Sequence, residues 1–302
     1  MVRHSNKGIK SIRGTDYVLM AVIYTFIILL TMSIVIPFFI VFFQSVTPQE
    51  AMMGNQYSLI PKRFDFGAYK YLLLDSNQIL KGFGNSMFLV IVGTLFSLTL
   101  TTMAAYALSK RYLPYRKFLT YLVYIPMVFS GGLIPTYMVV RLTGLAGTLW
   151  ACIIPGAVSS WNLFLMRNFF YGVPEEMEEA AMLDGASEAV IFLWIVLPVS
   201  LPVIATMALF YGVGQWNSWF SPSLYLNNSS QWPLQLVVRQ MLNTMNMGFS
   251  DNLSAMEDLL KNMPSDNIKK AAVFITTIPV LFFYPFAQKY FIKGMVVGSV
   301  KG

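Results

Sequence analysis

Charged residues are scarce in this sequence, and cysteine and histidine are almost missing. Only 12% of the 302 residues are Asp, Glu, Lys or Arg and 56% are hydrophobic, whereas an average soluble domain is roughly 25% charged. This scarcity argues against a soluble domain and predicts a membrane protein with several spans. The lone Cys152, inside an apolar run, excludes an internal disulfide and is most simply a small buried side chain. The one histidine, His4, lies in the N-terminal tail, where we expect it to be solvated.

Ionisable residues are absent from the interiors of the long apolar runs. Catalysis within the membrane needs a nucleophile, an acid–base pair or metal ligands, and none is available there. Carriers driven by protons or sodium ions usually hold an ionisable group at membrane depth. Since this chain lacks one, the energy for transport must come from another source. The sequence also lacks a GxxxxGK[S/T] phosphate-binding motif. We therefore expect no catalytic residue, no metal site and no bound cofactor on this chain, and any ATP must bind another polypeptide.

The apolar runs divide the chain into spans and loops. Six runs are long enough to cross a bilayer with some tilt, at residues 17–43, 82–109, 118–140, 146–166, 189–216 and 271–288. They form a single transmembrane domain over 17–292, between a basic tail at 1–16 and a short tail at 293–302. The third run contains two prolines and two adjacent glycines, which predict a helix broken near its middle. Residues 217–270 are too polar for the membrane and form a predicted external loop, with amphipathic helices over 241–260.

The basic residues indicate how the chain is oriented. The net charge is +7, but the Lys and Arg residues flank apolar runs and do not form a stripe interleaved with aromatic residues, so nucleic-acid binding is not indicated. With six spans, both termini lie on one side, and that side carries more than half of the 21 Lys and Arg residues on shorter loops. This side should be the cytoplasm. Lys269 and Lys270, at the outer end of the sixth span, are exceptions to this excess of basic residues in the cytoplasm. They do not change the orientation that the count over the whole chain indicates.

One charged stretch, residues 174–188, interrupts the apolar runs and must lie in water. Pro174 followed at once by acidic residues is typical of a helix start, because proline suits the first turn and carboxylates suit the positive end of the helix dipole. Gly185 predicts the stop, since glycine readily takes a left-handed conformation. Ser187 is expected to cap the next helix. From the residues alone, this bent elbow is either a functional element or a solvated connection between two spans.

A fixed pattern of residues distinguishes these alternatives. Glu179-Ala180-Ala181, Gly185, Ile195 and Leu197-Pro198 stand at the offsets of the EAA signature, so the stretch resembles that of bacterial ABC-importer permeases. Asp184 before the glycine resembles the variant of carbohydrate permeases of the maltose type. The resemblance implies an all-helical type I importer permease fold in which the elbow is a cytoplasmic coupling helix that docks on a separate ATPase. The residues expected to make that contact are Glu178, Glu179, Ala180, Ala181, Asp184 and Gly185.

Other segments extend the resemblance over most of the chain. Residues 130–137 (SGGLIPTY), 289–295 (KYFIKGM) and 298–302 (GSVKG) look like the maltose-type branch that serves complex oligosaccharides. The family implies a multi-pass protein of the bacterial cell membrane that forms a heterodimer with a homologous second permease. It also implies two copies of an ATPase that binds ATP and Mg²⁺, and an extracellular sugar-binding protein.

Aromatic and amide side chains near the spans are chemically suited to sugars, because rings stack on C–H faces and amides bond to hydroxyl groups. The candidates are Tyr137, Trp161, Asn162, Trp216 and Asn217. Each can equally belong to an interfacial aromatic belt or to helix packing. For the whole chain, the alternative to a permease is a membrane channel or scaffold whose elbow docks some other cytoplasmic protein.

Overall fold

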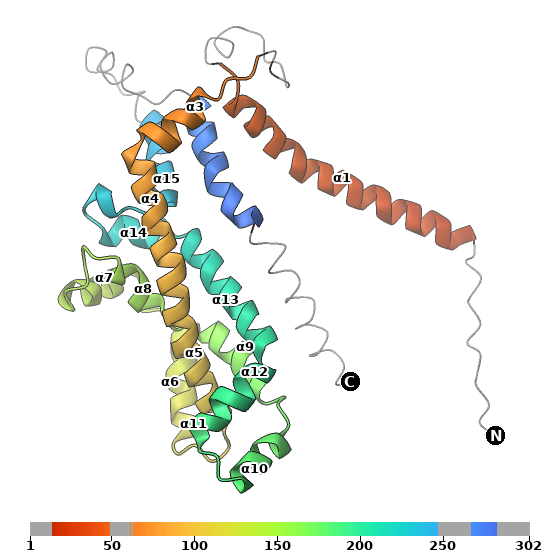
Figure 1. Cartoon of the computed structure of the whole chain (residues 1–302), viewed down its shortest axis with the longest axis vertical. Coiled ribbons are helices and arrows are strands. Elements are labelled where there is room, and N and C mark those ends of the chain that lie inside the picture. Colours follow the sequence, from red (N-terminus) through yellow and green to blue (C-terminus); the bar gives the residue numbers. More distant parts are fainter. Residues whose placement is uncertain (1–13, 49–60, 62, 247–266, 283–302) are drawn as a thin grey trace.

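The computed structural model describes residues 14–48, 61, 63–246 and 267–282, and throughout these ranges the chain is helical with no strand (Figure 1). Several predicted features fall outside them: the basic tail before residue 14, the part of the external loop at 247–266, and the end of the sixth span from residue 283 with the closing motifs. By length and composition, two described helices can cross a membrane, Tyr17–Ser45 and Asn77–Ser109. A third crossing is obtained if a strongly bent pair, Glu188–Val199 with Leu201–Trp216, is counted as one span.

The first span, α1 (Gly14–Ser45), stands apart from the other helices over most of its length (Figure 1). None of its most apolar stretch is buried. Its contacts lie at the C-terminal end, where the Phe42 ring centroid is 5.0 Å from that of Phe274 and the Ser45 hydroxyl shares a 2.6 Å hydrogen bond with the Tyr69 hydroxyl. An apolar helix exposed on all sides needs lipid or another protein around it.

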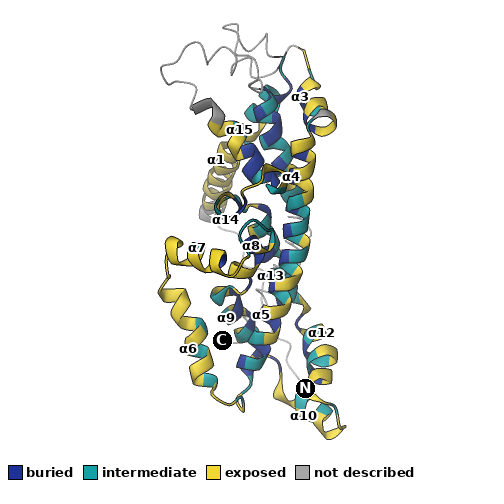
Figure 2. Cartoon of the chain, turned by 90° about the vertical axis from the view of Figure 1, so that its left-hand side faces the viewer, coloured by how far each residue is buried: buried dark blue, intermediate teal, exposed yellow. Residues whose placement is uncertain are grey.

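The second span is one uninterrupted helical segment. It runs through α4 (Asn77–Phe88), a π-helical turn (Leu89–Gly93) and α5 (Thr94–Ser109). The helix begins earlier than residue 82, because the Ser76 hydroxyl caps it by accepting a hydrogen bond from the Ile79 N–H at 3.4 Å. α5 buries seven residues and packs against both α9 and α13. It therefore lies at the centre of the membrane domain (Figure 2).

The third and fourth predicted spans are both interrupted. The predicted break in the third is confirmed, since α6 (Arg116–Val128) ends before Phe129 and α7 (Leu133–Leu142) begins after Gly132, whose φ is +86°. Figure 2 shows α7 lying across the direction of α6. The fourth comprises α8 (Trp150–Ile153), a 3-10 turn (Ile154–Gly156) and α9 (Ser160–Phe170). Cys152 of α8 is buried, as predicted.

A sharp bend divides the predicted fifth span. Its first part contains α11 (Glu188–Val190), a π-helical turn (Ile191–Val196) and α12 (Leu197–Val199), and its second part is α13 (Leu201–Trp216). The two parts meet at an angle of 81°. Pro198 and Pro202 flank the bend and have no N–H to donate to the preceding turn, which accounts for its position.

Helices at the other end cover α4. They are α3 (Gly67–Lys70), α15 (Leu234–Asn246) and a helix of residues 267–282, while α14 (Phe220–Tyr225) packs against α8 and α15. Much of the predicted external loop is thus structured, because its apolar residues have α4 to pack on. Leu234, Val237 and Ala271 are fully buried there with Ile79 and Leu72. This outer core is separate from an inner core that joins α5, α9 and the start of the fifth span.

Candidate functional site

The predicted elbow is α10 (Glu175–Leu183), and it projects from one end of the molecule (Figure 1). The helix begins directly after Pro174 and carries Glu175, Glu176 and Glu178 in its first turn, which suits the helix dipole. It stops at Gly185, whose φ is +81°. The Gly185 N–H donates to the Met182 carbonyl at 3.0 Å and the Ala186 N–H to the Ala181 carbonyl at 2.9 Å. This pair of bonds is the glycine-dependent stop known as a Schellman motif.

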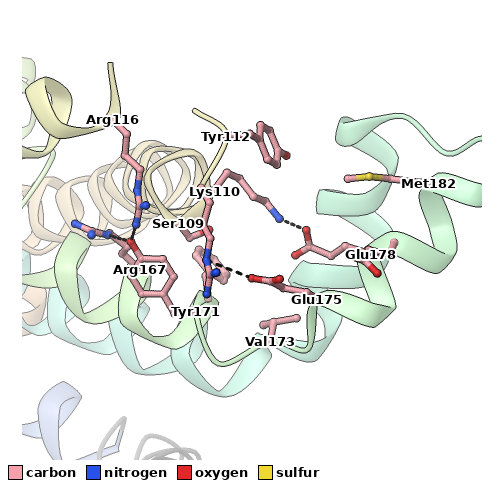
Figure 3. A pocket seen from close by; sticks show the side chains of 13 residues that line it. Ser109, Lys110, Tyr112, Arg116, Arg167, Tyr171, Val173, Glu175, Glu178 and Met182 are labelled. Carbon is pink, nitrogen blue, oxygen red and sulfur yellow. Dashed lines mark hydrogen bonds and ion pairs between the residues drawn. The ribbon is translucent and has the colours of Figure 1, made fainter. Parts of the chain in front are cut away.

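An ion pair anchors the inner side of α10. The Lys110 ammonium, just beyond the end of α5, pairs with the Glu178 carboxylate, and these side chains are only 12% and 14% exposed. A second pair, Arg111 with Glu175 at 3.6 Å, is open to solvent. Figure 3 shows both glutamates pointing from α10 toward the short link that follows α5. Since buried ion pairs depend on geometry far more than exposed ones, Glu178 fixes the position of α10 and Glu175 adds little.

A second carboxylate ties the same link to the start of the fifth span. Glu188, the first residue of α11, accepts hydrogen bonds from the Tyr106 hydroxyl at 3.1 Å and from the Tyr112 hydroxyl at 2.5 Å. Burial, the hydrogen bond to Glu188 and the nearby negative charges of Glu188 and Glu178 raise the pKa of the Tyr112 phenol. The Lys110 ammonium also lies 4.2 Å from the centre of the Tyr106 ring. Charged and phenolic groups thus connect α5, α10 and α11. Ser187 occupies the expected position before α11, but its side chain makes no capping hydrogen bond with that helix.

The residues predicted to contact an ATPase point in two directions. Glu179, Ala180, Asp184 and Gly185 are exposed, and Glu179 lines a pocket of about 690 Å³ beside α10. Glu178 instead faces its own chain, and Ala181 is half-buried against the inner core. The outward side of α10 also carries Leu183, which is 90% exposed.

Sequence reasoning missed the residues that hold the elbow in place: Lys110, Tyr106, Tyr112 and Glu188. The sequence places Glu188 at the end of the charged stretch 174–188 and indicates no role for the other three. The one signal in the sequence is the short link between residues 109 and 116, which keeps the ends of α5 and α6 close to each other. The remaining motif residues support the bent span: Ile195 and Leu197 are half-buried, and Pro198 precedes the bend.

The five sugar-contact candidates do not form one cluster. Within the described residues, no hydrogen bond or ring contact joins any two of them. Trp216 is 4% exposed and donates its indole N–H to the Thr276 carbonyl at 3.1 Å, and Asn162 is 8% exposed within α9. Tyr137 stacks on Tyr225 with ring centroids 6.2 Å apart. Trp161 and Asn217 are exposed, so these two have the side-chain access that a sugar requires.

Comparison with known proteins gives the family. Residues 102–297 match the family described as "Binding-protein-dependent transport system inner membrane component". Protein LplC of Bacillus subtilis (strain 168) is 43% identical over 89% of this chain and 90% of its own length. The polygalacturonan/rhamnogalacturonan transport system permease protein YtcP of the same strain is 41% identical over 93% of this chain and 97% of its own length.

A solved structure shares the fold as well as the sequence. It is the crystal structure of a bacterial ABC transporter involved in the import of the acidic polysaccharide alginate. One of its chains superposes with a TM-score of 0.83 and 27% identity, covering 92% of this chain and 98% of that one. These similarities favour a permease over an unrelated channel or scaffold. The chain therefore belongs to the family of binding-protein-dependent transport system inner membrane components, as a permease subunit of an ABC importer.

Proposed function

We propose that this permease forms half of the translocation pathway of an ATP-driven oligosaccharide importer and receives its driving force through α10. The observation that carries the proposal is the division of α10 into two sides. Glu178 anchors the helix to the link after α5, while Glu179, Ala180 and Leu183 remain exposed. A helix that is fixed on one side and open on the other can transmit a push from a docked protein to the spans. In this arrangement Glu179 meets a basic group of the ATPase.

Oligosaccharides are the proposed cargo. Support comes from the relatives: YtcP is named for polygalacturonan and rhamnogalacturonan transport, and the structural relative for the import of alginate. Trp161 and Asn217 are the proposed sugar contacts on this chain, since their side chains are accessible. The buried Trp216 instead supports the packing of α13 against the helix of residues 267–282.

The proposed assembly contains a homologous second permease, two copies of a cytoplasmic ATPase and an extracellular sugar-binding protein. ATP and Mg²⁺ are bound by the ATPase. The exposed apolar sides of α1 support an assembly in which lipid and a second permease surround this helix. We place six spans in the membrane, with both termini and α10 in the cytoplasm, on the basis of the distribution of Lys and Arg.

Isolation of the complex tests this function. A tagged chain purified from its own membranes in mild detergent should bring down an ATPase and a second permease. Reconstituted with the cognate binding protein, the complex should take up oligogalacturonides or related oligosaccharides when ATP is supplied. A purified homo-oligomer that conducts solutes without an ATPase would favour the channel alternative.

Cysteine labelling tests the orientation. Ser187 and Ser230 are both exposed, and Ser230 lies near α4 because its carbonyl accepts a 2.9 Å hydrogen bond from Asn85. In a Cys152→Ser background, a membrane-impermeant thiol reagent should label Ser230→Cys in intact cells. Ser187→Cys should react only after permeabilisation. Labelling of both from outside would disprove the six-span arrangement.

A further inference from the structure

A groove between α6 and α9 carries basic residues at one end and aromatic residues at the other. It has a volume of about 450 Å³ and is lined by Arg116, Lys117, Thr120, Tyr121, Tyr124, Phe164 and Arg167. The three basic residues lie in the first turn of α6 and the last turn of α9. Tyr124 follows Arg116 by about 12 Å along the axis of α6, at roughly 1.5 Å per residue. The groove is therefore cationic near α10 and becomes aromatic toward the membrane interior.

The basic end has no carboxylate partner within the described part of the chain. The guanidinium groups of Arg116 and Arg167 both donate to one neutral oxygen, the Tyr171 hydroxyl, with an Arg167 Nε distance of 2.8 Å (Figure 3). Lys117 is exposed and makes no described hydrogen bond or ion pair. The nearby Glu178 and Glu175 are paired with Lys110 and Arg111. Glu179 lines the adjoining pocket but makes no described ion pair with Arg116 or Arg167. Neighbouring cations without an ion-paired carboxylate repel one another, and a bound anion relieves that repulsion.

The aromatic end also determines what kind of anion fits. Tyr121 and Tyr124 are exposed on α6, and the Tyr124 ring meets Phe164 edge-on with centroids 6.4 Å apart. The Arg167 guanidinium lies 5.6 Å from the Phe164 ring, where the charged and apolar parts of the groove meet. Tyrosines favour the level of lipid headgroups, and basic pockets between spans on the cytoplasmic side suit anionic headgroups. A free phosphate would occupy only the cationic end.

We propose that the α6–α9 groove is a binding site for an anionic phospholipid of the cytoplasmic leaflet. Arg116, Lys117 and Arg167 hold the headgroup phosphate, and Tyr121, Tyr124 and Phe164 contact the glycerol and the start of an acyl chain. This assignment to the cytoplasmic leaflet rests on the orientation given under the proposed function. Because the groove adjoins the pocket beside α10 through Arg116 and Arg167, the lipid would fix the end of α6 next to the elbow.

Native mass spectrometry of the purified complex, delipidated and titrated with phosphatidylglycerol, tests the site without measuring transport. A cation near an anionic headgroup contributes roughly a fivefold factor in affinity, so Arg116→Gln with Lys117→Gln should weaken binding roughly 25-fold. Lys117→Gln alone should weaken it roughly fivefold and breaks no described contact. Arg141→Gln, an exposed arginine on α7, is the matched control and should leave binding unchanged. Equal binding by all four proteins would overturn the proposal.

Three further arms exclude other occupants. Phosphatidylcholine should bind far more weakly than phosphatidylglycerol, and equal binding would show that the groove does not read the headgroup charge. Glycerol 3-phosphate at millimolar concentration should not displace the lipid, and displacement would assign a soluble phosphate to the site.

In a Cys152→Ser background, Tyr121→Cys should react with a lipophilic maleimide in the assembled complex. Protection there, with reaction in the isolated chain, would show that the second permease covers the groove. Lipid binding by a complex that fails to transport sugar would reject the proposed function and retain the lipid site.

Discussion

At the α10 end of the molecule, charged and phenolic groups make the connections between helices, whereas at the opposite end α4, α15 and the helix of residues 267–282 pack through buried apolar side chains. α10 has no buried residue, and its anchors are the Lys110–Glu178 pair and its packing on the inner core. At the outer end, Leu234, Val237 and Ile79 are at most 1% exposed. Apolar burial favours one fixed arrangement, while a few polar anchors permit a small element to move as a unit.

Because of this difference, substitutions at the two ends of the molecule should have different effects. A change in the α10 end should alter coupling and leave the amount of folded protein nearly normal. A change in the outer core should lower stability and abundance before it alters coupling.

The largest effect is expected from Glu179→Lys. Glu179 is exposed and free to meet a basic group of the ATPase, so reversal of its charge places like charges against each other in the docked interface. Docking should weaken by about 2–5 kcal/mol. Sugar uptake should fall sharply and the binding protein should no longer stimulate ATP hydrolysis, with normal abundance of the chain in the membrane. Uptake and ATPase rates in the same proteoliposomes measure this.

Two companions make that result specific. Glu176→Lys places the same charge on an exposed residue of the same helix, and it should change uptake little. If it is as damaging as Glu179→Lys, general charge near the membrane is responsible and the docking role of Glu179 is wrong.

Gly185→Val should also uncouple ATP hydrolysis from sugar uptake, because a β-branched residue at φ +81° strains the turn by about 1 kcal/mol or more.

The next effect tests the anchor of α10. Lys110→Glu leaves the largely buried Glu178 beside a like charge, and it should destabilise the position of α10 by about 2–4 kcal/mol. The double variant Lys110→Glu with Glu178→Lys restores an opposite pair and should recover a substantial part of the coupling. ATPase stimulation by the binding protein measures both. A double variant no better than Lys110→Glu would mean that the pair does not position the helix.

The elbow could be predicted from the sequence because its determinants are local. Proline before a run of acids and glycine with a left-handed φ specify where α10 starts and stops, and both were identified. The break between α6 and α7 was local in the same sense, since its two prolines and two glycines lie within residues 126–135.

What escaped prediction depends on contacts distant in sequence. Lys110 meets Glu178 and Tyr106 meets Glu188 only after α5, α10 and α11 are placed, and no periodicity encodes such a pairing. The loop at 217–270 was predicted from its polarity, with amphipathic helices expected only from residue 241, whereas α15 begins at Leu234. Its helix α15 forms because apolar residues such as Leu234 are buried against α4, and the sequence does not specify that partner.

A smaller effect is expected at the outer end. The Ser86 hydroxyl, on α4, accepts a 2.9 Å hydrogen bond from the buried Leu234 N–H at the start of α15. Ser86→Ala leaves that N–H unsatisfied and should cost about 1–3 kcal/mol of stability. The thermal unfolding temperature of the detergent-purified complex should fall, while the sugar-stimulated ATPase rate per folded complex should be unchanged. Uncoupling by Ser86→Ala without a loss of stability would contradict the division between the two ends.

The smallest effect concerns the phenol of Tyr112. Burial and the adjacent Glu188 and Glu178 raise its pKa above the ordinary value of 10.0, so the protonated phenol is the form that bonds to Glu188 in the folded protein. Since the folded pKa is raised, this stabilisation is fully present below pH 10 and is lost only as the pH rises through the raised value. Between pH 6 and 9, wild type and Tyr112→Phe should therefore differ by a constant amount. The amount should be under about 1 kcal/mol, because Tyr112 is 62% exposed and solvent screens the bond. Unfolding midpoints measured across this range test it, and a difference that disappears between pH 6 and 9 would show that the Tyr112 phenol titrates there and that Glu188 does not hold it protonated.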